Sequence, residues 1–467
     1  MHRTMLCAMA FAVAWGTPLA GRAQDSELSK LREEVRQLRQ AYESRIQALE
    51  ERLKETEAKA GKAEQSAAQA ETAAAGAGTR PAGENAFNPA VSLILQGTLA
   101  GSSRDPETYR ISGFVPSGGE VAPPKRGFSL AESELIVSAS VDPYFRGQLT
   151  AAFTPDNRVE VEEAYFQTLA LGRGFTLKGG RFLSGIGYQN EIHQHAWDFQ
   201  DASLVYKAFL GGRLNDDGLQ LRWVAPTDLF VELGAELGRG RQFPGAERNR
   251  NSVANAGSLF GHTGGDIGAS TAWRAGLSYL RASPQDRSYD DLDSTGTGVS
   301  NSFSGKTRLW AVDGILKWAP NGNSTQTNLK LQGEYFQRSE DGSLSYDTQA
   351  ASLGTQTGSY SSRQSGWYLQ GVYQFIPQWR VGYRYDRLSA GTTSIGLVGS
   401  GALRAADFPI LGGYNPKRNT LMVDWSASEF SRLRLQLARD YSRIGEPDNQ
   451  VLLQYIMSLG AHGAHKF

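Results

Sequence analysis

Two histidines, His193 and His195, lie in a stretch that also carries Glu191 and Asp198. Imidazole nitrogens and carboxylate oxygens are ligands that zinc takes in proteins. His193 and His195 could share a face, and with Glu191 or Asp198 they would then hold a metal ion. A structural zinc ion usually takes four ligands, however, and only two histidines are close together here. The simpler interpretation is that these loop histidines form hydrogen bonds within the fold, so no cofactor is expected.

Charged residues form a second set of candidates, because they recur on the more polar face of segments in which apolar and polar residues alternate. Around a water-filled lumen, opposed charges set a transverse field and a selectivity. A weak preference for anions is one hypothesis, and simple solvation of the lumen wall is the alternative. The candidate pore-lining residues are Arg146, Lys178, Arg222, Arg274, Lys330, Arg380, Arg384, Arg432, Arg434, Glu232 and Glu236, with further acids at Glu160, Glu162, Asp313, Glu334 and Asp386.

No enzyme is expected, because the sequence contains no Gly-x-Ser-x-Gly elbow, no His-Glu-x-x-His and no P-loop. A Ser/His pair assembled by the fold is left open. The net charge of +0 gives no electrostatic argument for nucleic acid. Outside the N-terminal leader, no apolar run of about 18 residues predicts a membrane-spanning helix.

The end of the chain alternates with the period of a strand. From Val451, every second residue is mostly apolar, and the series ends on Phe467. The residues between them are more polar, which predicts one apolar and one wetter face. The ending resembles the closing strand of bacterial outer-membrane barrels, and Tyr455 and Phe467 would then form the signal for barrel assembly.

The same alternation recurs upstream, for example at 89–100, 229–237 and 433–437. Tight turns are expected at 141–144, 225–228, 375–378 and 426–430. Long Gly/Ser/Asn-rich loops are expected at 101–126, 183–217, 240–270, 339–364 and 389–419. Short turns at one end and long loops at the other are typical of outer-membrane barrels. The pattern predicts an all-β, transmembrane antiparallel barrel of about 16 strands, with the even count depending on a polar strand at 287–293. A sandwich or propeller is the alternative.

The N-terminal part has a different composition. Residues 1–23 read as a signal peptide with cleavage after Ala23, and the lone Cys7 lies within it. Residues 24–70 carry apolar residues at spacings of three and four between charged flanks, which predicts an α-helical coiled coil, or else an amphipathic helix lying on the barrel. Residues 71–87 are an Ala/Gly-rich linker, and the barrel occupies 88–467. A short coiled coil needs partner chains, and a trimer is expected.

Two segments carry a resemblance to a known family. The run from Phe175 to Phe182, followed by Gly185-Ile-Gly187, and the run from Asp217 to Arg222 resemble segments of the phosphate-selective-porin-like group of Gram-negative outer-membrane channels. Some of its members carry an N-terminal periplasmic coiled coil. The resemblance implies a homotrimeric porin in the cell outer membrane, where its partners are lipid, the barrel assembly machinery and, in one interpretation, peptidoglycan. Its function would be passive diffusion of small hydrophilic solutes. The alternatives are a receptor that takes up a specific ligand or metal such as zinc, and a tether to the cell wall.

Overall fold

The structure is a computed structural model that describes residues 89–118, 121–245 and 253–460. The chain divides into two units, Met1–Ala86 and Phe87–Phe467, and every described residue belongs to the second. The predicted signal peptide (1–23), coiled coil (24–70) and linker (71–87) lie outside the described residues, as does Phe467. None of the helices in the described ranges is long and apolar enough to cross a membrane.

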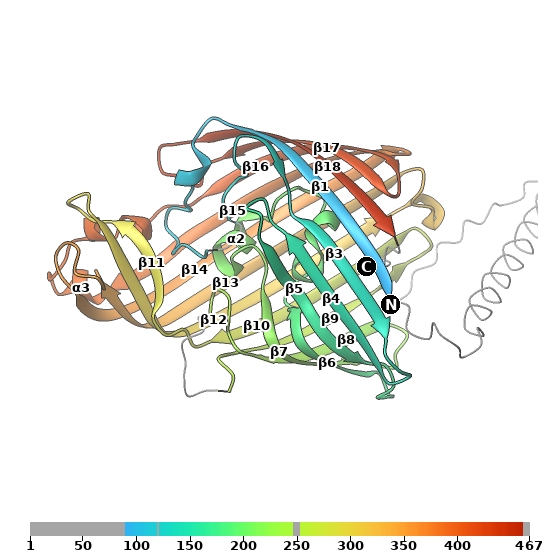
Figure 1. Cartoon of the computed structure of the whole chain (residues 1–467), viewed down its shortest axis with the longest axis horizontal. Coiled ribbons are helices and arrows are strands. Elements are labelled where there is room, and N and C mark those ends of the chain that lie inside the picture. Colours follow the sequence, from blue (N-terminus) through green and yellow to red (C-terminus); the bar gives the residue numbers. More distant parts are fainter. Residues whose placement is uncertain (1–88, 119–120, 246–252, 461–467) are drawn as a thin grey trace, which may run out of the picture. The chain divides into compact units, whose positions relative to one another are not determined.

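The described residues form one sheet of 18 strands with short helices in the connections (Figure 1). The strands are β1 (Ala90–Ser102), β2 (Gly127–Leu130), β3 (Ser133–Ser140), β4 (Phe145–Phe153), β5 (Val159–Thr168), β6 (Phe175–Leu183), β7 (Asn215–Val224), β8 (Phe230–Gly238), β9 (Ala256–Ile267), β10 (Thr271–Ala282), β11 (Arg287–Leu292), β12 (Gly298–Trp318), β13 (Asn328–Tyr346), β14 (Gln356–Ile376), β15 (Trp379–Ile395), β16 (Lys417–Ser428), β17 (Ser431–Asp440) and β18 (Asp448–Gly460). The helices are η1 (Pro106–Thr108), η2 (Gln189–Glu191), η3 (Gln194–Ala196), α2 (Leu204–Leu210), η4 (Pro320–Gly322), α3 (Gly396–Gly399), η5 (Ala405–Asp407) and η6 (Pro409–Leu411).

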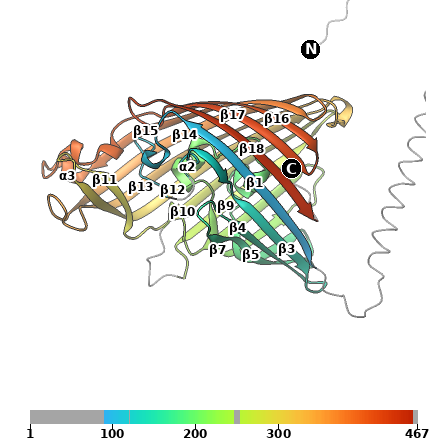
Figure 2. The same cartoon turned by 45° about the horizontal axis from the view of Figure 1, so that its top comes forward.

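The sheet closes on itself. β1 pairs antiparallel with β18 from Ser92 opposite Gly460 to Ser102 opposite Gln450, so the first and last strands lie side by side (Figure 2). Successive strands from β3 to β10 and from β11 to β18 also pair antiparallel, as do β1 and β2. Closure leaves no sheet edge with unpaired backbone groups, which is the condition for a sheet that crosses a membrane.

The barrel has 16 strand positions, as predicted, although it has 18 strands. β2 and β3 both pair with β1 and occupy one position. β11 pairs with the first part of β12, and β10 pairs with the second part, so β10 and β11 together occupy another. A strand therefore exists at 287–292, but the prediction that the even count depends on it is wrong, because it prolongs the position of β10.

Residues alternate between an outer apolar face and an inner polar face, as the period of a strand requires. On β18, Val451 and Leu453 are 49% and 43% exposed, whereas Leu452 and Gln454 are 2% and 1% exposed. The predicted apolar face of this last strand is thus the outer surface of the barrel.

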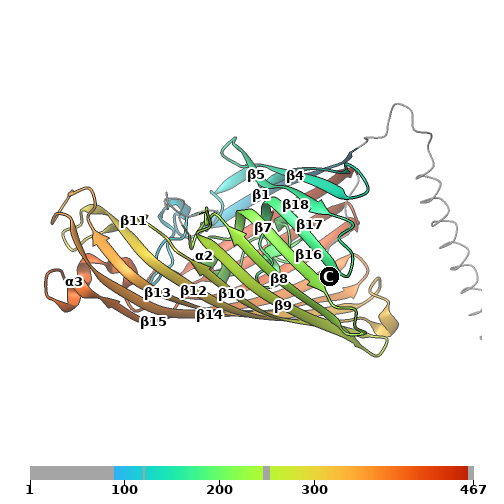
Figure 3. The same ribbon diagram turned by 90° about the horizontal axis from the view of Figure 1, so that it is seen from below.

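The four predicted tight turns lie at or beside strand connections at one end of the barrel. Three predicted long loops are shorter than expected. Residues 256–267 form β9, and β13 and β14 extend to Tyr346 and from Gln356 into the predicted loop 339–364. In the predicted loop 389–419, β15 continues to Ile395. The extensions of β13 and β14 are rich in Ser, and their apolar residues Leu344, Tyr346 and Tyr360 are buried, so they lack the exposed apolar alternation seen on β18. β12–β15 extend beyond the shorter strands toward the end that carries α3 and β11 (Figure 3).

Two connections enter the barrel. The segment 184–214 carries η2, η3 and α2, and α2 contacts β13, β14 and β15 from inside (Figures 1 and 3). All seven residues of α2 are buried, and the helix ends at Gly211 with a left-handed φ of 66°. Part of the segment 103–126 joins it, because Ile111 and Phe114 belong to the same apolar cluster as Leu204 and Phe209. The inward segment and this part of 103–126 therefore occupy part of the lumen at this level.

Candidate functional site

The segment 184–214 is held by polar side chains of the barrel wall. Glu236 accepts hydrogen bonds from the Gly185 amide (2.8 Å) and from Gln220 Nε2 (2.7 Å). The amide of Leu204, at the start of α2, donates to Asp386 Oδ1 (2.9 Å). A connection enters a barrel only if its backbone polar groups find partners there, and the inner wall supplies them.

Glu334 of β13 is a further anchor of this segment. It accepts hydrogen bonds from the amides of Tyr188 (3.0 Å) and Gln189 (3.1 Å), and from the hydroxyls of Tyr206 (2.9 Å) and Tyr368 (2.6 Å). Four donors on one carboxylate fix both the start of the segment and its helix relative to the wall.

The two ends of the segment 184–214 are joined by the side chain of Asn190, which is fully buried. Its Nδ2 donates to the carbonyls of Ser184 and Leu214, both at 2.8 Å, and the Leu214 amide donates to its Oδ1 at 2.7 Å. One side chain therefore joins the first and last turns of the inward segment.

Several Lys and Arg side chains lie close together on the inner wall formed by β12, β13, β15 and β17. Lys330 and Arg380 contact Asp198 of the segment at 2.8 and 3.2 Å. Asp424 is shared by three guanidinium groups, with Arg434 Nε at 2.8 Å, Arg432 Nε at 3.9 Å and Arg380 as the third. We call these residues and the adjacent Lys317 the basic cluster: Lys317, Lys330, Arg380, Arg432 and Arg434 around Asp198 and Asp424.

The carboxylates of the basic cluster are fewer than its cations, so the cluster itself carries an excess of positive charge. The effect is clear at Asp198. Burial alone would raise its pKa, but Lys330 and Arg380 hold that pKa below the usual range.

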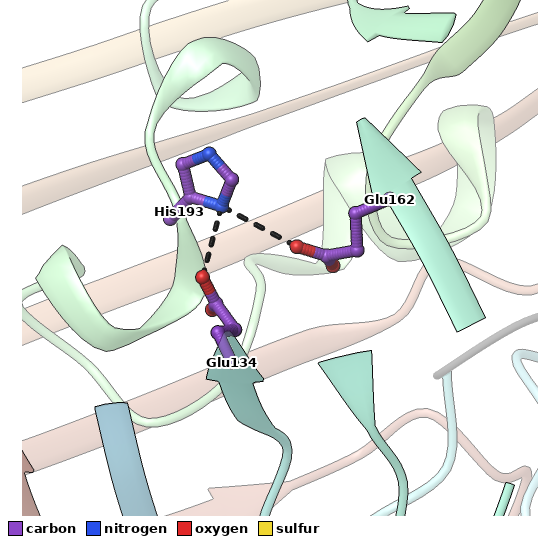
Figure 4. A group of neighbouring side chains, drawn as sticks. All are labelled: Glu134, Glu162 and His193. Carbon is purple, nitrogen blue, oxygen red and sulfur yellow. Dashed lines mark ion pairs between the residues drawn. The ribbon is translucent and has the colours of Figure 1, made fainter. Parts of the chain in front are cut away.

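Acids crowd the opposite part of the wall, on β3 and β5. His193 Nδ1 lies 3.1 Å from Glu134 Oε2 and 3.3 Å from Glu162 Oε2, and its Nε2 lies 3.0 Å from Glu163 Oε2 (Figure 4). Burial alone would lower the pKa of His193, but these carboxylates outweigh burial and hold that pKa well above its usual value. We call Glu134, Glu162, Glu163 and His193 the acidic cluster.

A β-bulge explains how two consecutive glutamates reach the lumen together. The pairing of β4 with β5 shifts register between Thr150 and Ala151, which face Glu163 and Val161 respectively. Glu162 is the extra residue of the bulge, so Glu162 and Glu163 are both buried inside. Arg213 at the end of the segment pairs with Glu162 and, at 2.9 Å, with Glu132.

The two histidines predicted as metal ligands do lie together, with ring centroids 5.8 Å apart. Their predicted acidic partners are elsewhere. Glu191 pairs with Arg222, and Asp198 belongs to the basic cluster. The spacing in sequence suggested Glu191 and Asp198, but the acids near the histidines come from strands distant in sequence.

The predicted pore-lining residues fall into several environments. Arg146 is exposed and donates to Ser138 Oγ (3.1 Å), and the buried Lys178 lies 4.4 Å from the centre of the Tyr165 ring.

Glu236 was expected to line the pore but is buried under the inward segment as an anchor. Arg384 is likewise buried, contacting Asp201 and Asp386, both at 3.1 Å. The predicted basic strip lies on the inner wall and consists of Arg380, Arg384, Arg432 and Arg434. Its acidic partners could not be predicted from the alternation.

Arg222, Arg274 and Glu232 line a cavity near the end that carries the short turns, whereas Glu160 is exposed and Asp313 is buried elsewhere on the wall. This cavity of about 370 Å³ is lined by Tyr188, Glu191, Arg222, Glu232 and Arg274, among others. Arg222 lies between Glu191 and Glu232, and the Arg274 guanidinium lies 5.2 Å from the centre of the Tyr188 ring. Tyr455, which was predicted as part of the signal for barrel assembly, lies on the outer face of β18.

Sequence reasoning missed several residues of these clusters, namely Glu134, Glu163, Asp201, Arg418 and Asp424. Each lies on the inner face or on the inward segment, and Asp201 contacts Lys207 (2.9 Å) and Arg418. Counting inward positions along β16 would have found Arg418 and Asp424, since both share the phase of its buried residues.

Comparison with known proteins places the chain among relatives. No family model matches it. An uncharacterized protein of Aquifex aeolicus strain VF5 is 30% identical over 410 residues, which cover 82% of this chain and 81% of that protein. The chain belongs to the same family as this protein.

Solved structures with a similar course of the chain include outer-membrane proteins. The trimer form of OmpT from Vibrio cholerae has a TM-score of 0.48 and 10% identity, covering 80% of this chain and 99% of that one. OprB of Pseudomonas putida has a TM-score of 0.46 and 13% identity, with coverages of 80% and 94%. An anion-selective porin from Comamonas acidovorans has a TM-score of 0.45 and 11% identity, with coverages of 80% and 99%. Similarity at this level carries no information on solute or mechanism.

Proposed function

We propose that the protein is an outer-membrane channel through which small hydrophilic solutes diffuse without energy input. The observation that carries this proposal is the closed barrel with an apolar outer face, a charged inner face and a connection folded into the lumen. An apolar outer face suits lipid, and a charged inner face suits water and polar solutes. The inward segment 184–214 narrows the passage, so permeating solutes are small.

A weak preference for anions forms part of the proposal. The basic cluster and the acidic cluster lie on different parts of the wall, with the inward segment contacting both. Opposed charges across a narrow lumen create a transverse field, which orders water and steers ions. The excess positive charge of the basic cluster supports an anion path along β12–β17.

The test is conductance of the refolded protein in a planar lipid bilayer, with a salt gradient across the membrane. Stepwise openings support a channel, and the reversal potential gives the sign of its selectivity. A clear preference for cations would refute the anion path. Silence from protein shown to be folded would refute the open channel and favour a ligand-specific receptor or a tether to the cell wall.

The proposed assembly is a homotrimer with the N-terminal coiled coil in the periplasm. The heptad-like spacing of residues 24–70 supports an association through these helices. Chemical cross-linking of the full mature chain in detergent should give a trimer. The same experiment on a chain lacking residues 24–70 separates association through the coiled coil from association through the barrel.

A further inference from the structure

The acidic cluster contains three atoms that converge on one point. His193 Nδ1 lies 3.1 Å from Glu134 Oε2 and 3.3 Å from Glu162 Oε2, and all three ligand atoms lie within 4.8 Å of one another. Figure 4 shows one ring nitrogen facing both carboxylates. Ligands of a tetrahedral metal ion with bonds of about 2.0–2.2 Å are about 3.3–3.6 Å apart. The separation from Glu162 falls in that range, and the separation from Glu134 is slightly shorter.

Within the described residues, Glu134 Oε2, Glu162 Oε2 and His193 Nδ1 contact one another and form no hydrogen bond to any further group. Glu134 itself is fully buried, and Glu162 is 7% exposed. Without an ion, the proton on Nδ1 of the imidazolium is what the two carboxylates share. A divalent cation can replace that proton, because all three atoms face one point and metal binding releases the protons of its ligands.

The other atoms of these side chains are held as metal ligands usually are. His193 Nε2 lies 3.0 Å from Glu163 Oε2, so a ring that binds a metal ion through Nδ1 would keep its Nε2 proton and donate it to this carboxylate. His195 Nδ1 lies 3.2 Å from Glu134 Oε1. Arg213 binds Glu162 Oε1. Each candidate ligand is therefore oriented by a neighbour that contacts its second polar atom.

We propose that Glu134, Glu162 and His193 bind a divalent transition-metal cation, with a fourth position open to water. Imidazole together with carboxylates suits zinc and its neighbours, whereas calcium and magnesium prefer oxygen alone. The excess negative charge around His193 favours a cation. Since His193 lies on the segment 184–214 and the glutamates lie on β3 and β5, the ion joins the segment to the wall.

The test is Zn²⁺ binding by the folded, detergent-solubilised mature chain, measured by equilibrium dialysis and metal analysis. His462 and His465 near the C-terminus are other potential ligands. All proteins therefore carry His462→Asn and His465→Asn as a common background. We expect one Zn²⁺ per chain in this background protein.

Three variants locate the ion. His193→Asn should weaken Zn²⁺ binding by more than 100-fold. Glu163→Gln, which removes the acceptor behind the imidazole, should weaken it about 10- to 100-fold. His262→Asn is the matched control, because His262 is also buried beside a carboxylate, 2.9 Å from Glu232 Oε1, but lies outside the three-ligand group. Binding by this control should be unchanged.

Folding of each variant is checked by its heat-dependent mobility in gels. If His193→Asn does not fold, X-ray absorption of the zinc-loaded background protein replaces it, and a shell of nitrogen and oxygen with one imidazole is expected. No binding by the background protein would overturn the proposal. So would unchanged binding by folded His193→Asn, or a shell with several imidazoles.

Discussion

Gly187 occupies a position that no other residue fits. Its φ of +67° is left-handed, and a Cβ there would lie 2.6 Å from the Tyr206 hydroxyl and closer still to the Glu334 carboxylate. Gly187→Ala should therefore disturb the anchor of the inward segment. The free energy of unfolding should fall by about 1–3 kcal/mol more than backbone strain alone would cause. It is measured by urea unfolding in detergent, followed by tryptophan fluorescence.

The matched control for this change is Gly268→Ala. Gly268 has a similar φ of +64°, but a Cβ there has nothing within 4 Å. Both variants carry the strain of a left-handed alanine, and only Gly187→Ala adds the steric conflict. Equal losses of stability in the two variants would contradict the anchoring role of Gly187.

Asn190 is the second residue on which the inward segment depends. Asn190→Ala removes three hydrogen bonds and leaves the buried Leu214 amide without its acceptor. A buried group left unpaired costs about 1–3 kcal/mol. Without this side chain, the two ends of 184–214 should separate more readily, and protease should cleave this segment faster in the folded barrel. Asn328→Ala removes a solvent-exposed hydrogen bond from Nδ2 to Ser324 O, far from the segment in sequence, and should leave the cleavage rate unchanged.

At the scale of elements, α2 rests on a part of β14 where Gly366 provides the space. A Cβ at Gly366 would lie 2.8 Å from Val205 Cγ1 of α2 and closer still to Leu388 Cδ2, and both of these residues are fully buried. Gly366→Ala should push α2 from the wall and cost about 1–3 kcal/mol. The midpoint of heat-dependent gel mobility should fall. Gly314→Ala on β12, with open space around its Cβ, should leave that midpoint unchanged.

The sequence predicted the elements best where one face of a strand is the apolar outer surface of the barrel. The alternation on β1, β8, β17 and β18 was sufficient, because apolar residues occupy every second position there. It was not sufficient for β9, where glycines occupy several positions. It also could not predict the bulge of β5, because a bulge breaks the period of two on which the prediction rests.

At the scale of the whole molecule, the sequence predicted the barrel and its 16 strand positions, but the alternation gave no sign that Ile111 and Phe114 enter the lumen. The candidate charges were found on the inner face, but their partners could not be. A pair such as Arg434 and Asp424 depends on the register between β16 and β17, which only the assembled sheet defines.

Ion selectivity is a property of the whole lumen, and a change at Arg432 tests it most directly. Its side chain is partly exposed, at 26%, and its Nε lies 3.9 Å from Asp424, which Arg434 and Arg380 already neutralise. Its charge is therefore poorly compensated and available to a passing anion. One unit charge at 4 Å contributes about 1 kcal/mol in water-like surroundings. Arg432→Gln should accordingly lower the ratio of chloride to potassium permeability by up to about fivefold.

The measurement is the reversal potential in a potassium chloride gradient, and the same strand provides the control. Arg439 lies on the outer face of β17, with its guanidinium 5.5 Å from the centre of the Tyr441 ring. Arg439→Gln removes the same charge from the same strand but not from the lumen, so its permeability ratio should equal that of the unchanged protein. The anion path along the basic cluster is wrong if both variants behave alike, or if Arg432→Gln raises the preference for chloride.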